Sequence, residues 1–224
     1  IKNHSNRKQE AANLYLDWVS FLPAKRESRR ILGDYVLKEQ DVLGNRIFED
    51  AIAYGGWHLD SHRPEGFYAF INNAPCNGDQ AVAFEGIYTI PYRSIYARGI
   101  QNLFLGGRII SASHRAFSST RVMATCAVEA QAAGVSAVLA VRDGLTAKEN
   151  IRNIKEIQQE LLKQGCYIPG FRNEDEKDLA RIAKVSADSS LSGYEPEHVI
   201  NGISRPEGDE SNMWAPRIKR FLTA

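Results

Sequence analysis

One stretch of the chain constrains the fold more than any other: residues 102–123 read NLFLGGRIISASHRAFSSTRVM. A short apolar run ends abruptly in Gly106 and Gly107, which is typical of a buried strand whose end must let something approach its backbone closely. A hydroxyl-rich segment follows, and after it a long run of small residues with helical character. Open α/β sheets bind ligands where strands end and helices begin. The stretch therefore predicts an α/β fold with a ligand site at this point.

The helix after the glycines is expected to begin at Ser118 or Ser119 and to run to about Val141. Serine and threonine commonly cap helix starts, so Ser118, Ser119 and Thr120 are candidate caps. A helix N-terminus carries unpaired N–H groups and about half a positive charge, so it binds anions readily. Arg121 in the first turn indicates a negative ligand or carboxylate nearby, because the helix dipole disfavours a cation there. Ordinary caps beside a solvated arginine are the alternative.

The inner positions of this helix are small, so we expect it to pack very close to its neighbours. It has roughly the ~20-residue length of a membrane span. However, Glu129 lies within it, and a carboxylate at mid-helix in lipid costs ~2.5–3.5 kcal/mol. We therefore expect no membrane span.

Composition excludes several classes of function. The formal net charge is +1, so nothing draws the whole chain toward nucleic acid, and we expect no nucleic-acid partner. The three cysteines form no CxxC pair and their number is odd, which argues against a zinc ribbon and a disulfide framework. The apolar fraction of 43% and the charged fraction of 25% are close to the averages of globular proteins, so we do not expect wholesale disorder.

Other elements follow from periodicity and from breaker residues. Apolar spacing predicts an amphipathic helix over 5–22, stopped by Pro23. Strands are expected within 29–37, 49–66, 82–97 and 102–107.

A second long helix follows the first. The segment Thr146–Glu149 has capping-box spacing and opens this helix, and Gly165 ends it. Residues 172–224 are rich in Ser, Gly, Pro and Asn, so we expect one domain over 1–171 and a linker with the start of another module over 172–224.

Three blocks carry a family resemblance: RESRRILGDYVLKEQDV, AIAYGGWHLDSHRP and FEGIYTIPYRSIYARGIQNLFLGGRIISASHRAFSSTRVMATCAVEAQAAG. Together they resemble the C-terminal half of the FAD-dependent oxidoreductase family, the flavoproteins with two dinucleotide-binding folds. The resemblance implies FAD as cofactor, a small-molecule organic substrate, and transfer of a hydride or electron pair between that substrate and flavin. The implied fold is the C-terminal portion of a Rossmann-like FAD/NAD(P)-binding domain.

The resemblance also implies roles for individual residues. Gly106 and Gly107 would let the backbone pass close to the cofactor, with Arg108 and Ser111 near its ribityl or diphosphate group. The helix start from Ser118 to Val122 would point at the N1 and C2 carbonyl edge of the flavin. Reduction places negative charge there, and a helix dipole stabilises it.

The dinucleotide fingerprint GxGxxG of that family does not occur in this sequence. The fold that the resemblance implies is therefore incomplete within this chain. We expect the pyrophosphate and adenosine sites on a segment upstream of Ile1, which would be a partner within the same protein.

Candidate catalytic residues are Asp60, His62 and His114. Strand alternation puts His58, Asp60 and His62 on one face, as a proton-transfer set beside the flavin or as hydrogen-bonded structural residues. No matching ligand set is apparent elsewhere, so we expect no metal. His114 lies between the glycines and the helix start, where the resemblance implies proximity to the flavin.

Residues 180–216 resemble the opening of a discoidin-like, galactose-binding β-sandwich. An ordered tail on the flavoprotein part is the alternative. A sandwich beside a flavoprotein suggests a sugar as substrate, although fold is a weak guide to function. The alternative functions are a carbohydrate-binding or scaffold module without redox activity, and a fragment that is inactive alone. Periplasmic, secreted and cytoplasmic locations are all compatible with the sequence.

Overall fold

The computed structural model describes residues 6–22, 27, 29–61 and 81–217. The elements in chain order are α1 (Glu39–Leu43), β1 (Ala51–Gly55), β2 (Tyr88–Pro91), η1 (Tyr92–Ser94), η2 (Gly107–Ile109), α3 (His114–Thr120), α4 (Met123–Arg142), η3 (Glu149–Asn153), α5 (Ile154–Lys163), η4 (Leu179–Ile182) and η5 (Pro196–Ile200).

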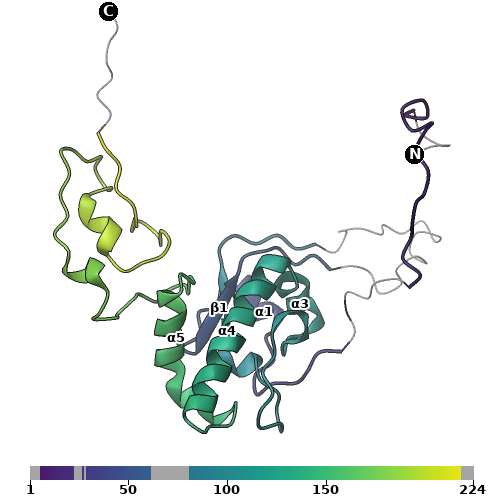
Figure 1. Ribbon diagram of the computed structural model, residues 1–224, viewed down its shortest axis with the longest axis horizontal. Coiled ribbons are helices and arrows are strands. Elements are labelled where there is room, and N and C mark those ends of the chain that lie inside the picture. The colour runs from purple at the N-terminus through teal and green to yellow at the C-terminus, as the bar shows by residue number, and fades with distance from the viewer. Residues whose placement is uncertain (1–5, 23–26, 28, 62–80, 218–224) are drawn as a thin grey trace, which may run out of the picture.

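The strands β1 and β2 form an antiparallel pair at the centre of the main body (Figure 1). The register runs from Ala51 opposite Pro91 to Gly55 opposite Tyr88, with an irregularity between Ala51 and Ala53. Nearly every residue of both strands is buried, because α4 and α5 pack on β1 while α1 packs on β2. The strands predicted within 49–66 and 82–97 are confirmed in these short central parts.

The strands predicted within 29–37 and 102–107 reduce to single bridges, so these two predictions are wrong. Leu37 bridges Ala112 and Phe104 bridges Tyr96. Between 31 and 37 the N–H groups alternate between two acceptor segments: Ile31 bonds to the carbonyl of Ile109, whereas Tyr35 bonds to that of Arg93. A chain that changes partner at each step builds no continuous ladder.

The predicted helix over 5–22 is also wrong for the residues that the structure describes there. Residues 6–13 form turns, and most apolar side chains of 14–22 lie exposed, Trp18 and Phe21 among them. An amphipathic helix of this length depends on packing of its apolar face. That face has no core to pack against in this arrangement.

The helix expected from Ser118 to Val141 is divided in two. Ser118, Ser119 and Thr120 end α3, and α4 begins only at Met123. The cap of α3 is Ser113, whose Oγ accepts from the Ala116 N–H at 3.2 Å. The expectation that Ser118 to Thr120 cap the long helix is therefore wrong.

Two other helix signals are confirmed. The Glu149 carboxylate accepts from the Thr146 N–H at 3.0 Å, and the Thr146 hydroxyl accepts from the Glu149 N–H at 3.2 Å. This box opens the turn η3, which leads into α5. Gly165 lies just beyond α5 with φ +83°, a conformation that favours glycine.

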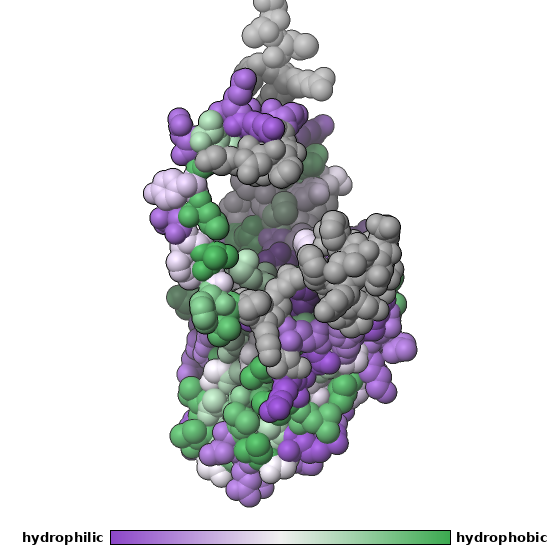
Figure 2. Space-filling model, turned by 90° about the vertical axis from the view of Figure 1, so that its right-hand side faces the viewer, coloured by the Kyte–Doolittle hydropathy of each residue, from purple (hydrophilic) through white to green (hydrophobic). Residues whose placement is uncertain are grey.

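Helix α4 is long and apolar enough to cross a membrane by length and composition alone. A single helix of this kind is weak support for a span, since core helices pass the same test. Its buried side chains pack on β1, η2 and α5. Hydrophobic side chains on one face of the molecule are interspersed with hydrophilic ones (Figure 2).

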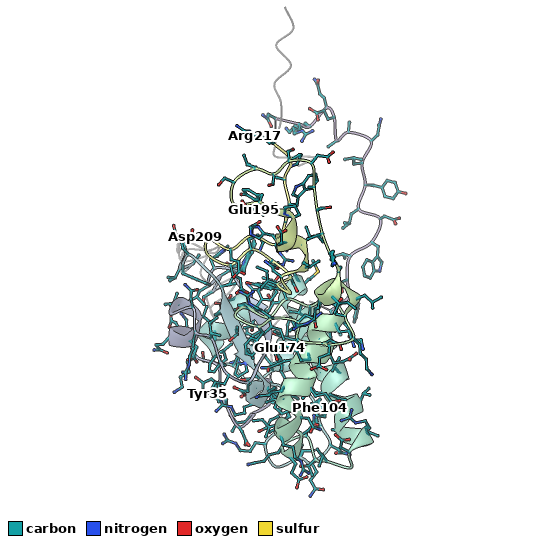
Figure 3. The ribbon with its side chains drawn as sticks, turned by 90° about the vertical axis from the view of Figure 1, so that its left-hand side faces the viewer. Tyr35, Phe104, Glu174, Glu195, Asp209 and Arg217 are labelled. Carbon is teal, nitrogen blue, oxygen red and sulfur yellow. The ribbon has the colours of Figure 1, made fainter. Side chains whose placement is uncertain are left out.

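Residues 172–217 form a separate lobe beyond α5 (Figure 1). The lobe contains η4, η5 and one bridge between Glu207 and Glu210, and within 172–217 no longer strand occurs. Glu195 and Asp209 lie in this lobe, whereas Tyr35 and Phe104 lie in the main body (Figure 3). The β-sandwich opening stays a prediction.

Candidate functional site

A groove of about 760 Å³ opens where α3 meets α4. Its lining residues are Arg108, Arg121, Val122, Met123, Cys126 and Ala127. Arg108 belongs to η2 and the others to the helix junction, so the turn after the glycines and the start of α4 form one surface. Three predicted cofactor-binding residues, Arg108, Arg121 and Val122, are brought together here.

The N-terminus of α4 opens on this groove without a side-chain cap. Val122 occupies the cap position and makes no side-chain hydrogen bond to the helix. A helix of 20 residues presents its positive end to any ligand in the groove, and its first N–H groups are available as donors. A helix start thus lies at this groove, a few residues later than expected, and its binding of an anion stays a prediction.

Arg121 is fixed by Asp60. Its Nη2 donates to the Asp60 carboxylate and to the Asp60 carbonyl oxygen, each at 2.9 Å. The Arg121 side chain is only 12% exposed, so it cannot sweep freely through solvent. Arg121 is the C-cap of α3, where the helix dipole favours a cation, so its expected place in the first turn of the long helix is wrong. A carboxylate partner is nonetheless present, and the pair joins a predicted catalytic residue to a predicted cofactor-binding residue.

The predicted hydroxyl groups differ in their bonding. Ser118 Oγ donates to the Arg115 carbonyl oxygen at 2.6 Å. Ser119 Oγ bonds to the hydroxyl of Tyr88 at 2.7 Å and to the Trp57 carbonyl oxygen. Both serines are thus satisfied inside the protein.

Ser111 and Thr120 are also buried, but their hydroxyl oxygens have no hydrogen-bond partner within the residues that the structure describes. A buried hydroxyl without a hydrogen-bond partner costs folding free energy, and such groups in proteins are usually hydrogen-bonded. These two predicted residues therefore retain bonding capacity that the two serines have already used.

The two glycines permit close packing against α4. A Cβ on Gly106 would lie 3.0 Å from the Ala130 Cα, and Gly107 has φ +75°. A side chain at Gly106 would therefore crowd the backbone of α4, and a side chain at Gly107 would be strained by the positive φ. The glycines thus bring η2 onto α4 and set Arg108 in the groove, while their predicted approach to a cofactor remains a prediction.

His114 lies at the first position of α3 and does not line the groove. Its Nδ1 lies 2.8 Å from Glu27 Oε1, and Glu27 also pairs with Arg30. Burial raises the pKa of Glu27, but hydrogen bonds from His114 and Arg30 outweigh it and leave that pKa below its ordinary value. His62 lies outside the described residues, and Asp60 does not line the groove but contacts the groove-lining Arg121.

Glu129 is a buried acid that the functional prediction missed. It is 0% exposed, and neither carboxyl oxygen has a hydrogen-bond partner of ordinary geometry in the described part of the chain. Burial raises its pKa well above the ordinary value. In the sequence, Glu129 is a single carboxylate within a run of small apolar residues, and that pattern could have indicated a buried acid.

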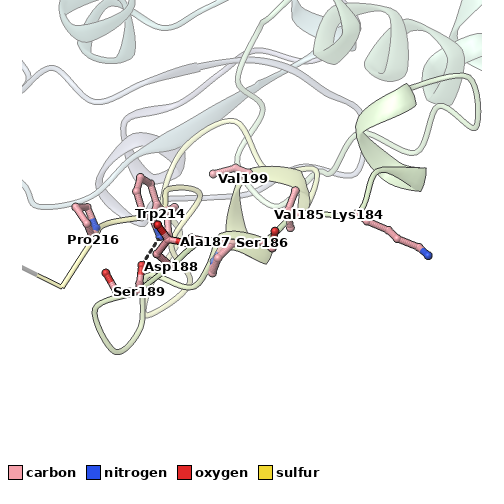
Figure 4. A pocket seen from close by; sticks show the side chains of 10 residues that line it. Lys184, Val185, Ser186, Ala187, Asp188, Ser189, Val199, Trp214 and Pro216 are labelled. Carbon is pink, nitrogen blue, oxygen red and sulfur yellow. Dashed lines mark hydrogen bonds between the residues drawn. The ribbon is translucent and has the colours of Figure 1, made fainter.

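A second cavity of about 720 Å³ lies in the C-terminal lobe, with Trp214 in its wall (Figure 4). The Trp214 Nε1–H donates to the Ser189 carbonyl oxygen at 3.1 Å, which fixes the ring. Asp188 and Ser186 supply polar groups, and Val199 and other apolar residues supply the rest of the wall. This cavity and the groove at α4 share no residue.

Comparison with known proteins gave one match. A family model described as FAD dependent oxidoreductase matches residues 2–161, which include α1 through most of α5. Searches of curated proteins and of solved structures found no match to the chain. The matched range contains the groove at α4 and ends before the C-terminal lobe.

Proposed function

Because the chain belongs to the family of FAD-dependent oxidoreductases, we propose that the groove at the start of α4 receives the flavin end of its cofactor. The family makes the protein an oxidoreductase with FAD as cofactor and a small molecule as substrate. The observation that carries the site assignment is the uncapped N-terminus of α4, open to a groove lined by two arginines.

The residues present fit an anionic cofactor. Arg108 and Arg121 supply positive charge, and the first N–H groups of α4 supply donors. The hydroxyls of Ser111 and Thr120 have no partner in the described residues, but both residues are buried and neither lines the groove, so the two arginines and the helix start carry the fit. Each of these groups was expected from the sequence to face the cofactor.

When bound, FAD supplies the acceptor and donor of a hydride or electron pair, and the protein supplies the electrostatics. The start of α4 stabilises negative charge in the groove, and it needs no rearrangement to do so. Arg121 adds a full positive charge, and Asp60 holds its guanidinium in one orientation. Asp60 thus acts in this proposal as a positioning residue.

His114 is proposed to act on the substrate side. Its ring is held by Glu27, which fixes the orientation of the second ring nitrogen. The proposal rests on its place between the groove-lining turn η2 and the end of α3.

The rest of the cofactor site is proposed to come from an upstream segment that contains GxGxxG. This sequence lacks that fingerprint, and its described sheet has two strands, whereas pyrophosphate binding in Rossmann-like folds uses a strand, a glycine-rich turn and a helix start. The present chain would then be the C-terminal portion of a Rossmann-like flavoprotein fold.

A second candidate function concerns the C-terminal lobe, for which we propose carbohydrate binding. The fixed ring of Trp214 in the wall of the cavity, beside Asp188 and Ser186, presents an apolar face next to hydrogen-bonding groups. A sugar offers the complementary apolar and hydroxyl surfaces, and it would also be the substrate class of the oxidoreductase.

The flavin site is tested on the full-length protein, purified without added flavin. We expect flavin absorption bands that survive gel filtration and that are lost in Arg121→Ala. The matched control is Arg152→Ala, which removes an exposed arginine of η3 far along the chain from the groove. If R121A retains flavin as well as R152A does, the groove is not the flavin site.

A further inference from the structure

We propose that Glu129 is a proton-holding positioning residue for the groove at the start of α4. Its carboxyl group is protonated when FAD binds, and loss of that proton weakens FAD binding. This inference rests on the proposed function of the groove. Glu129 acts through the turn and the helix that line the groove rather than by touching the cofactor.

The burial of Glu129 dictates the protonated form. Neither carboxyl oxygen has a hydrogen-bond partner of ordinary geometry within the described residues, and the residue is 0% exposed. An ionised carboxylate in such surroundings is far more costly than a neutral one. Burial accordingly raises the pKa of Glu129, and the nearby Gly107 N–H lowers it only in part.

Glu129 adjoins the groove through two connections. Cys126, three residues earlier on α4 and on the same face of the helix, lines the groove. Gly107, whose N–H approaches Glu129, directly precedes the groove-lining Arg108. A negative charge at Glu129 would therefore oppose the positive potential of the two arginines and of the helix start.

Three elements present groups that influence Glu129: β2 presents Tyr88, α4 presents Cys126 and η2 presents the Gly107 N–H. Burial first, and then the charge on Glu129, raises the pKa of Cys126 to about 11. Burial likewise raises the pKa of Tyr88, with Glu129 again contributing. Tyr88 and Cys126 thus keep their protons at neutral pH, which leaves Glu129 as the member of this cluster whose charge can change first.

Linkage makes the consequence measurable. If FAD binds more tightly to the protein with protonated Glu129, bound FAD raises the pKa of Glu129 by the same free energy. In the pH range between the pKa of Glu129 in the free protein and its pKa in the FAD-bound protein, FAD affinity then falls by up to about tenfold for each unit by which the pH rises.

The test measures the FAD dissociation constant of the full-length protein by quenching of flavin fluorescence from about pH 5 to about pH 9. We expect the wild-type constant to rise with pH and that of Glu129→Gln, which keeps shape and removes the titration, to stay low. Glu160→Gln on α5 is the control for loss of a surface carboxylate and should titrate as the wild type does. If E129Q fails to fold, Glu129→Met is used in its place.

Infrared difference spectroscopy supplies a second readout that needs no turnover. The FAD-free wild type minus E129Q should show the carbonyl stretching band of a protonated carboxylic acid at neutral pH. Absence of that band overturns the inference, as does a pH dependence of FAD binding that E129Q shares with the wild type. FAD that binds at no pH overturns the proposed function of the groove and this inference with it.

Discussion

Arg121 donates from a single nitrogen, Nη2, to both the carboxylate and the main-chain carbonyl of Asp60, at 2.9 Å in each case. The contact ties the junction of α3 and α4 to the chain that follows β1. Because the Arg121 side chain is mostly buried, solvent screens this pair less than a surface pair.

A double-mutant cycle of Arg121→Ala and Asp60→Asn should therefore give a coupling of about 1–2 kcal/mol in the free energy of unfolding. The measurement is denaturant unfolding of the four proteins. A coupling near zero contradicts the finding that Asp60 fixes Arg121. Because it needs no flavin, this cycle tests the local structure separately from the cofactor.

Glu129 should make stability depend on pH. Its folded pKa lies above its ordinary value of 4.5, so the stability associated with its protonated form is fully present below that value. This stability is lost as pH rises through the folded pKa. Chemical unfolding across this range should show the loss in the wild type and a flatter profile in Glu129→Gln. A profile that is unchanged in E129Q contradicts a buried neutral acid.

Replacing glycine by alanine should change the stability of the protein in opposite directions at Gly107 and at Gly134. Gly107→Ala places a side chain at φ +75° and should destabilise the fold by about 1 kcal/mol or more. Gly134→Ala adds a methyl group on α4 with nothing within 4 Å, so it should stabilise by about 0.5–1 kcal/mol. Thermal unfolding of both variants checks the contrast, and equal effects of the two would contradict it.

Val122→Ser should separate helix stability from cofactor binding. A serine at this cap position accepts from an early N–H of α4 and should stabilise the protein by about 1 kcal/mol. The same bond occupies a donor that we assign to the cofactor, so FAD affinity should fall. Unfolding and FAD titration of one variant test both effects. A more stable protein with unchanged affinity shows that the helix start does not contact the cofactor.

Local chemistry explains which elements could be predicted. The capping box of Thr146 and Glu149 and the glycine after α5 act within a few residues of each other, so the sequence pattern was sufficient. The helix break at Arg121 and Val122 could not be read in this way, because the hydroxyl residues before it look like caps. The long-range bonds of Ser119 to Tyr88 and Trp57 keep those residues in α3 instead.

Three residues named from the sequence, Arg108, Arg121 and Val122, meet in the groove, and their role in binding the cofactor stays a prediction. Asp60 is a carboxylate partner of Arg121, although Arg121 ends α3 and does not open the long helix as predicted. Which residues line the groove depended on where α4 begins, which is a tertiary outcome. Glu129 remained hidden because its importance comes from burial and from missing hydrogen-bond partners, and neither is a property of sequence spacing.

The contact between Gly106 and Ala130 has a mechanical consequence. Because Gly106 has no side chain, the turn that carries Arg108 lies directly on α4, and Arg121 lies two residues before the first residue of that helix. Arg108 is thus held against α4 by this close packing, and Arg121 is held beside the start of the same helix by its bonds to Asp60. For the anionic cofactor that we propose for this groove, the charges would already be in place, so little free energy would be lost to their reorganisation.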